Sequence, residues 1–296
     1  MRDAVRRRPV LGFFALAYLL SWSWDVLLIA RGDTVRAGVG WPTHLPALLG
    51  PAVAAVVVTA VVEGRAGLGD LARRMTRWRV GWGWWAIVAG TASLMLLGAI
   101  VPLLTGSDVP ALGDFTRYSG IGSLTPIVVV VVALLVNGLG EETGWRGFAV
   151  DRLLREHSFT WTAVVVGAGW AGWHLPFFVM VDGFERMGPL AIGWLVGVMA
   201  GSVVLTWLYR EGHRSILLVA AWHTAYNFTS ATDATGAVVG TVTSILVISW
   251  AVWILRQEHL SARSSVRRRG EDAAPVHPRQ EHQAHQHRDL QGHAPR

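Results

Sequence analysis

The sequence predicts an all-α, polytopic membrane protein with about eight transmembrane helices. Hydrophobic residues make up 52% of its 296 positions, which is too apolar for an ordinary soluble domain. They gather in segments that each approach the roughly 20 residues that a bilayer core requires. These segments cover approximately residues 10–30, 44–62, 82–104, 124–141, 160–180, 189–209, 214–231 and 236–256. Because backbone groups in lipid must be hydrogen-bonded internally, we expect these continuous runs to be helices.

The distribution of arginine predicts the orientation of these helices. All 26 basic residues are arginines. If the spans alternate in direction, 22 of the arginines fall in the termini and the loops on the same side of the membrane as the N-terminus, against 4 in the loops on the other side. Positive residues near the ends of spans tend to stay in the cytoplasm, so both termini are predicted to be cytoplasmic. The Ala-, Gly-, Val- and Arg-rich composition suggests a bacterial chain, which predicts a place in the inner membrane.

One transmembrane domain is predicted over residues 1–260, with a motif-bearing core at about 124–231. Residues 261–296 are rich in Arg, His and Gln and nearly free of large apolar residues, so we expect a disordered cytoplasmic tail. The chain has no cysteine, which excludes disulfides and thiol nucleophiles. Although the net charge is +6, the arginines lie beside apolar spans and suit anionic lipid headgroups. Membrane lipids, and not nucleic acid, are therefore the expected partners.

Between the second and third predicted spans, residues 67–79 have the pattern of a helix lying in the membrane interface. One helical face is apolar and the other is predicted to carry arginines. The apolar set is Leu68, Leu71, Met75 and Trp78, and the basic set is Arg73, Arg74 and Arg77. Asp70 is expected to cap the start of this helix.

Ionisable side chains within spans are costly, and few are present. Apart from Asp25 at the end of the first span and His44 at the start of the second, they fall at the end of the fourth span, in the fifth and in the seventh. They are Glu141, Glu142, Arg146, His174 and His223, and the amide of Asn227 accompanies His223. A structural alternative for the glutamates is that they only end their span at the cytoplasmic interface.

Helical spacing separates the two adjacent glutamates. Glu142 and Arg146 are four residues apart, so they share a face and can pair. Glu141 is turned by about 100° from Glu142, which leaves it as a freer carboxylate in poorly solvated surroundings and a candidate general base. Small residues in this stretch are expected to let helices, or a substrate backbone, approach closely. They are Gly138, Gly140, Gly144 and Gly147.

The two histidines lie in different settings. Pro176 removes a backbone donor and is expected to kink its helix near His174. His223 and Asn227 are four apart and share a face, and their structural alternative is an interhelical hydrogen bond. Taken together, a carboxylate, two imidazoles and an amide are the parts of a hydrolytic site, with a base and donors for an oxyanion.

These motifs resemble those of a known family. EETGWR fits the pattern E-E-x-x-x-R, WAGWH fits F-x-x-x-H with Trp170 in place of Phe, and HTAYN fits H-x-x-x-N. Over about residues 10–256, the chain looks like an intramembrane protease of the CPBP family. This is the CAAX-processing and bacteriocin-immunity family, also called Abi, to which the Rce1-type prenyl-protein endopeptidases belong.

The resemblance implies an eight-helix fold with an intramembrane cavity that opens to the cytoplasm. It also implies that Glu141 and His174 activate the water that attacks a peptide carbonyl. By the same resemblance, His223 and Asn227 stabilise the oxyanion.

Further roles follow from the resemblance. Glu142 and Arg146 would position the other groups, and Trp170 and Trp145 are expected to line the substrate pocket. On a glutamate mechanism no cofactor is required. Zinc is the alternative, and its candidate ligands are Glu141, His174 and His223.

The predicted function is an intramembrane endopeptidase that cuts a membrane-associated protein or peptide, as CAAX prenyl proteases do. Two other classes stay open. One is a non-catalytic bacteriocin-immunity or binding protein that keeps the polar cluster for structure, and the other is a proton-coupled transporter. A transporter predicts an internal repeat, whereas the polar residues here fall only in the second half. The sequence carries no signal for an oligomeric state.

Overall fold

The computed structural model describes residues 2–232 and 234–272 and is built from helices. Two compact units are distinguished, one ending at Leu255 and one beginning at Arg256. The first helices are α1 Arg2–Arg7, α2 Pro9–Arg31, α3 Leu45–Leu48, α4 Gly50–Val62, α5 Gly64–Met75, α6 Trp82–Ser93, η1 Leu94–Leu96, α7 Leu97–Thr105 and η2 Leu112–Thr116. The others are α8 Pro126–Val132, η3 Ala133–Gly138, α9 Leu139–Gly144, η4 Trp145–Val150, α10 Asp151–Leu153, α11 Phe159–Trp173, α12 Phe177–Met180, α13 Asp182–Glu185, η5 Gly188–Leu190, α14 Ala191–Glu211, α15 Ile216–Ala231 and α16 Gly236–Asp272.

Seven helical segments of the described chain are long and apolar enough to cross a membrane. They are Pro9–Arg31, Leu45–Val62, Trp82–Thr105, Pro126–Leu153, Phe159–Met180, Gly188–Glu211 and Val238–Ser264. Within the described residues, extended pairing is limited to isolated bridges of Val35 with Val181 and Ala37 with Ser119. The predicted all-α, polytopic membrane fold is therefore confirmed.

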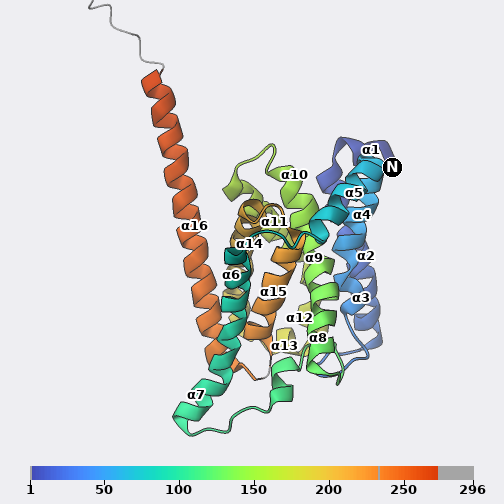
Figure 1. The fold of residues 1–296 in the computed structure, drawn as a ribbon. Coiled ribbons are helices and arrows are strands. Elements are labelled where there is room, and N and C mark those ends of the chain that lie inside the picture. Colours follow the sequence, from blue (N-terminus) through green and yellow to red (C-terminus); the bar gives the residue numbers. More distant parts are fainter. Residues whose placement is uncertain (1, 233, 273–296) are drawn as a thin grey trace, which may run out of the picture. The chain divides into compact units, whose positions relative to one another are not determined.

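The remaining predicted span, 214–231, is also a helix but a short one. α15 has 16 residues, because Ser215 caps its start and Thr232 returns the chain to an extended conformation. It packs against α6, α9 and α14 in the middle of the first unit (Figure 1). Since its length is below the roughly 20 residues of a full span, the eight predicted spans become seven long helices and one short, central helix.

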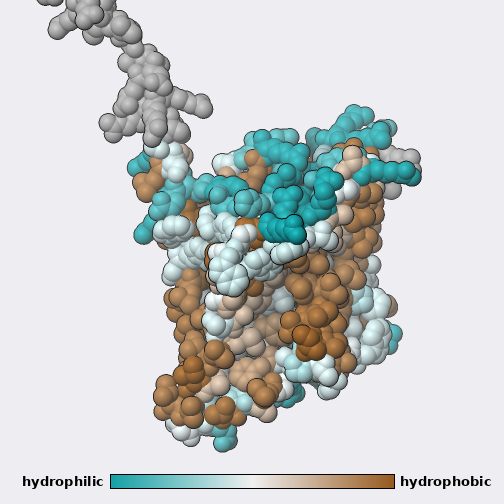
Figure 2. Space-filling model, viewed as in Figure 1, coloured by the Kyte–Doolittle hydropathy of each residue, from teal (hydrophilic) through white to brown (hydrophobic). Residues whose placement is uncertain are grey.

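The surface of the first unit has the distribution expected of a protein in lipid. Figure 2 shows hydrophobic residues along the sides of the helices and hydrophilic residues at the end where α1, α5 and α10 lie. α6 is apolar along its length, yet none of its residues is buried by the protein. An exposed apolar surface of this extent is one that lipid covers, and the chain is an integral membrane protein.

Local sequence signals set the ends of α11. Ser158 caps its start, where the Ser158 hydroxyl accepts a hydrogen bond from the Trp161 backbone N–H. The helix stops at Trp173, His174 is its C-cap, and α12 begins after Pro176. The break predicted near His174 is confirmed, and it frees this histidine from a regular helical turn.

α5 differs from the prediction in two of its charged residues. The helix begins at Gly64, so Asp70 lies inside it and does not cap it; its carboxylate instead accepts from Arg74 Nε at 2.7 Å. The prediction that Arg74 faces outward is also wrong, since the residue is 4% exposed. Its Nη1 donates to the Gly147 carbonyl at 2.7 Å and lies 3.6 Å from Asp151 Oδ1. These acceptors turn Arg74 inward and tie α5 to η4.

The C-terminal segment also differs from the prediction. α16 continues to Asp272, so residues 261–272 are helical where a disordered tail is predicted. Ala, Arg and Glu in this stretch favour helix, and the first proline after it is Pro275. Residues 273–296 of the predicted tail lie outside the described residues.

Candidate active site

The two glutamates lie in a helix that alternates between π-helical and α-helical turns. Glu141 and Glu142 belong to α9, a short α-helical segment between the π-helical segments η3 and η4. π-helical turns inside longer helices are found frequently at functional sites. Every residue from 140 to 150 is buried. The acids therefore do not end a span at the water interface but lie inside the packed helices.

Glycines bring the neighbouring helices close to α9. A Cβ on Gly138 would lie 2.8 Å from the Ala220 carbonyl oxygen of α15, and a Cβ on Gly144 would lie 2.7 Å from the Pro51 carbonyl oxygen of α4. Neither position has room for a side chain. The predicted close approach is confirmed, and it places α9 between α4 and α15.

Glu141 is held by hydrogen bonds from two side chains. It is 1% exposed. Asn137 Nδ2 donates to its Oε1 at 2.7 Å, and Trp170 Nε1 of α11 donates to its Oε2 at 2.7 Å. Each carboxylate oxygen can accept more than one hydrogen bond. Glu141 is thus fixed in position and keeps capacity for a further donor, such as a water molecule.

Glu142 has different partners from Glu141. Its Oε1 accepts from Arg146 Nη1 at 2.9 Å, which confirms the predicted pair, and contacts His223 Nδ1 at 2.8 Å. All three residues are buried. The guanidinium carbon of Arg146 also lies 4.5 Å from the centre of the Trp170 ring, a cation–π arrangement. Glu142 therefore joins α9 to η4 and to α15.

His174 is oriented by the backbone of its own helix. Its Nδ1 lies 2.8 Å from the Trp170 carbonyl oxygen. Because a carbonyl only accepts, Nδ1 carries the proton of this bond, and Nε2 is the acceptor of the neutral ring. The ring packs edge-on against Trp173, Phe177 and Trp194. An imidazole acceptor is thus held in apolar surroundings.

Asn227 completes the cluster from α15. Its Nδ2 donates to Asn137 Oδ1 at 2.6 Å and to the Tyr118 hydroxyl at 3.1 Å. Through these contacts and those of Trp170, the structure brings all six residues predicted as catalytic into one cluster, in which Asn227 alone is only partly buried. Their individual roles stay predictions.

The two tryptophans predicted for the substrate pocket lie in different surroundings. Trp170 contacts the cluster directly, and its ring meets the His223 ring edge-on at 5.3 Å. Trp145 is fully buried and packs against Phe13 and Trp173, with ring centres 5.4 and 6.0 Å away. Trp145 is part of the apolar core, and its packing gives no support to a contact with substrate.

Two residues of the cluster were not among the predicted site residues. Asn137 lies four residues before Glu141, so helical spacing could have identified it. Tyr118 lies in the segment between α7 and α8, where no periodic pattern points to the site. Its hydroxyl donates to Asn137 Oδ1 at 3.0 Å.

Comparison with known proteins supports the resemblance that the motifs carry. Residues 123–229 match the family model described as type II CAAX prenyl endopeptidase Rce1-like. The chain is also 22% identical over 240 residues to a protein of Methanococcus maripaludis named CAAX prenyl protease 2, and the alignment covers 77% of this chain and 85% of that protein. The matched residues include all six of the predicted cluster. These matches show that the chain is similar to Rce1-like proteases over its motif-bearing core. It is an intramembrane endopeptidase.

The zinc alternative names Glu141, His174 and His223 as candidate ligands. Among the described residues, no group of three or more His, Asp or Glu side chains is arranged to hold a metal ion. A catalytic zinc needs three converging protein ligands. We therefore derive no step through a metal.

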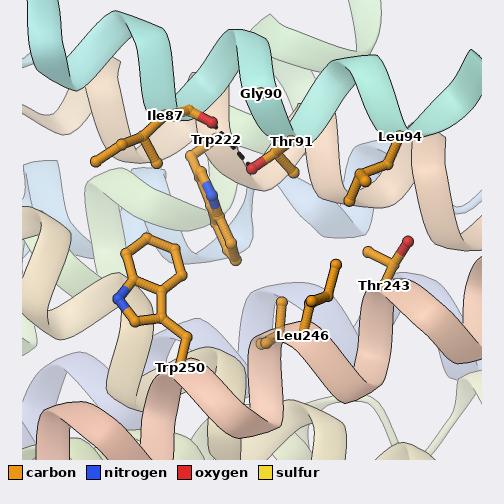
Figure 3. A pocket seen from close by; sticks show the side chains of 9 residues that line it. Ile87, Gly90, Thr91, Leu94, Trp222, Thr243, Leu246 and Trp250 are labelled. Carbon is orange, nitrogen blue, oxygen red and sulfur yellow. Dashed lines mark hydrogen bonds between the residues drawn. The ribbon is translucent and has the colours of Figure 1, made fainter.

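A cavity of about 270 Å³ lies apart from the polar cluster. Its lining comes from α6, η1, α15 and α16, and Trp222 and Trp250 point into it (Figure 3). The lining residues are Ile87, Gly90, Thr91, Leu94, Trp222, Thr243, Leu246, Val247 and Trp250. None of the predicted catalytic residues is among them, so this is not the cytoplasm-facing cavity that the resemblance implies, which stays a prediction.

Proposed function

We propose that this Rce1-like protease hydrolyses a peptide bond of a membrane-associated protein or peptide with a water molecule that Glu141 activates. The observation that carries the proposal is the setting of Glu141. Its carboxylate is buried, and both of its oxygens are held by donors, Trp170 and Asn137. Each donor residue has a further contact, Trp170 with His174 and Asn137 with Asn227. A fixed carboxylate in a water-poor site is suited to accept a proton from a bound water.

The proposed reaction uses only side chains of the cluster. As the water oxygen forms a bond to the substrate carbonyl carbon, one water proton passes to Glu141, while His174 Nε2 accepts a hydrogen bond from the water. The carbonyl oxygen becomes an oxyanion. The C–N bond then breaks, and the proton on Glu141 passes to the leaving nitrogen, which yields a carboxylic acid and an amine. In this proposal no cofactor is required.

The oxyanion would be stabilised from α15. Asn227 Nδ2 is one donor. His223 is the other, because its Nδ1 is engaged with Glu142, and Nε2–H can donate when the ring carries both protons. Donors placed where negative charge develops are often the largest single contribution to such catalysis.

The substrate class is supported by the comparisons and by the membrane setting. The relative's name refers to CAAX prenyl protease activity, and we extend this to a membrane-associated peptide cut near its membrane-embedded end. The test compares peptide termini in membranes of cells that carry the wild-type chain or Glu141→Gln. New termini at membrane-proximal sites are expected only with the wild-type chain. Identical sets of termini would contradict the proposal, and a farnesylated CAAX peptide serves as a second probe of substrate class.

The proposed location is a bacterial inner membrane with both termini in the cytoplasm. It is supported by the 22 arginines on the predicted cytoplasmic side, against 4 on the opposite side. Because the chain has no cysteine, single introduced cysteines report orientation directly. Glu156 and Ser107 are both exposed, in loops predicted on opposite sides. In intact cells, a membrane-impermeant maleimide is expected to label Ser107→Cys, and Glu156→Cys only after lysis. The reverse labelling would show the opposite orientation.

A further inference from the structure

A chain of hydrogen bonds joins the proposed base to Asn227 through two residues outside the three motifs. Asn137 Nδ2 donates to Glu141 Oε1, while Asn137 Oδ1 accepts from Asn227 Nδ2 at 2.6 Å and from the Tyr118 hydroxyl at 3.0 Å. The Tyr118 oxygen in turn accepts from Asn227 Nδ2 at 3.1 Å. Asn137 is thus the residue through which Glu141 and Asn227 are connected.

The chemistry of these partners allows one orientation of the Asn137 amide. The carboxylate of Glu141 accepts, so Nδ2 must face it, and Oδ1 must then face the donors on Asn227 and Tyr118. Turning the amide over would set its oxygen against the carboxylate and its NH₂ against the NH₂ of Asn227. Any displacement of Asn137 would therefore disturb Glu141 and Asn227 together.

Tyr118 occupies an N–H that the proposed reaction needs. Asn227 Nδ2 donates both to Asn137 Oδ1 and to the Tyr118 hydroxyl, and an amide nitrogen has two N–H groups. To bind an oxyanion, Asn227 must release one of them. The bond to Tyr118 is the longer of the two, and Tyr118 can keep donating to Asn137 when it is released. Tyr118 therefore holds Asn227 through a hydrogen bond that can be released while the bond from Tyr118 to Asn137 stays intact.

The setting of Tyr118 makes it a fixed donor. It is 7% exposed, its ring packs 5.1 Å from that of Phe228, and its carbonyl accepts from the Gly38 N–H at 3.1 Å. Burial raises the pKa of Tyr118, so the hydroxyl keeps its proton. Tyr118 precedes the residues 123–229 that match the family model.

We infer that Asn137 and Tyr118 are positioning residues of the hydrolysis: Asn137 holds Glu141 and Asn227 in one geometry, and Tyr118 holds the N–H that Asn227 turns toward the oxyanion. The inference rests on the proposed function. In the proposed reaction neither residue contacts the attacking water or the substrate, so their loss should slow turnover and leave substrate binding nearly unchanged.

The test measures kcat and KM per folded enzyme in proteoliposomes, with the substrate found by the terminus comparison. Tyr118→Phe removes both hydrogen bonds of the hydroxyl and is expected to lower kcat about 10-fold, with KM within about twofold. Asn137→Leu removes both links and is expected to lower kcat further, by about 100-fold. The matched control is Tyr226→Phe on α15, whose ring stacks on Trp222 outside the cluster, and which should keep the wild-type kcat.

A double variant separates positioning from a general loss of stability. Tyr118 is proposed to act through Asn137 and Asn227. The kcat of the double variant, Tyr118→Phe with Asn137→Leu, should therefore lie within about threefold of the kcat of Asn137→Leu alone. If the two residues acted independently, the two losses in kcat would multiply. A wild-type kcat in Tyr118→Phe, or multiplied losses in the double variant, would overturn the inference. In that case an inactive Glu141→Gln variant would still support the proposed function. A fully active Glu141→Gln would overturn the proposed function itself.

Discussion

Glu141→Gln is expected to hydrolyse substrate roughly 10²- to 10⁴-fold more slowly than the wild-type chain, the range for loss of a general base. Glutamine has nearly the same shape, and its amide oxygen can still accept from Trp170 or Asn137, so the fold should be kept. Its NH₂ group cannot take a proton from water. Initial rates in proteoliposomes, normalised to folded protein, measure the effect.

The matched control for this variant is Glu156→Gln. Glu156 is exposed in the loop between α10 and α11, and the same change of charge there should leave the rate unchanged. A Glu141→Gln rate within a few-fold of wild type would remove Glu141 from the chemistry, whatever the control shows.

Arg146→Met is expected to cost about 3–5 kcal/mol of stability, the effect of removing one partner of a buried ion pair. Arg146 and Glu142 are both 0% exposed and 2.9 Å apart, so the variant leaves a buried carboxylate without its cation. Thermal or denaturant unfolding in detergent should show a large fall in the midpoint, and much of the protein should fail to fold.

The partner substitution makes this prediction specific. Glu142→Gln combined with Arg146→Met removes both charges, and it should recover at least half of the lost stability, because the introduced amide oxygen can still accept from His223. Arg155→Met is the control, since Arg155 forms an i,i+4 pair with Asp151 but its side chain is 60% exposed; such pairs contribute about 1 kcal/mol or less. A wild-type midpoint in Arg146→Met would contradict the account of the pair.

Much of the site could be predicted because charged residues in a membrane are so costly. The six polar residues of three spans stood out against apolar sequence, and the four-residue spacing of Glu142 and Arg146 predicted a contact that the structure contains. The break at His174 followed from Pro176 alone. These features depend on contacts between residues close together in the chain, which can be predicted from residue spacing and type alone.

Features that depend on tertiary contacts could not be predicted in the same way. Tyr118 reaches Asn137 from a connecting segment that has no periodic pattern. Arg74 has the spacing of an outward-facing residue, but the Gly147 carbonyl and Asp151 carboxylate of distant segments turn it inward. Nor does the apolar content of α15 reveal that it ends after 16 residues.

The central claim is that Glu141 activates water and does not itself attack the substrate. Single-turnover cleavage in H₂¹⁸O, with enzyme in excess, tests this most directly. The account predicts one ¹⁸O atom in the newly formed carboxylate of the product, none in the enzyme peptide that contains Glu141, and almost no product from Glu141→Gln. Product without ¹⁸O together with ¹⁸O on Glu141 would show that the carboxylate attacks the peptide bond, and would contradict the claim.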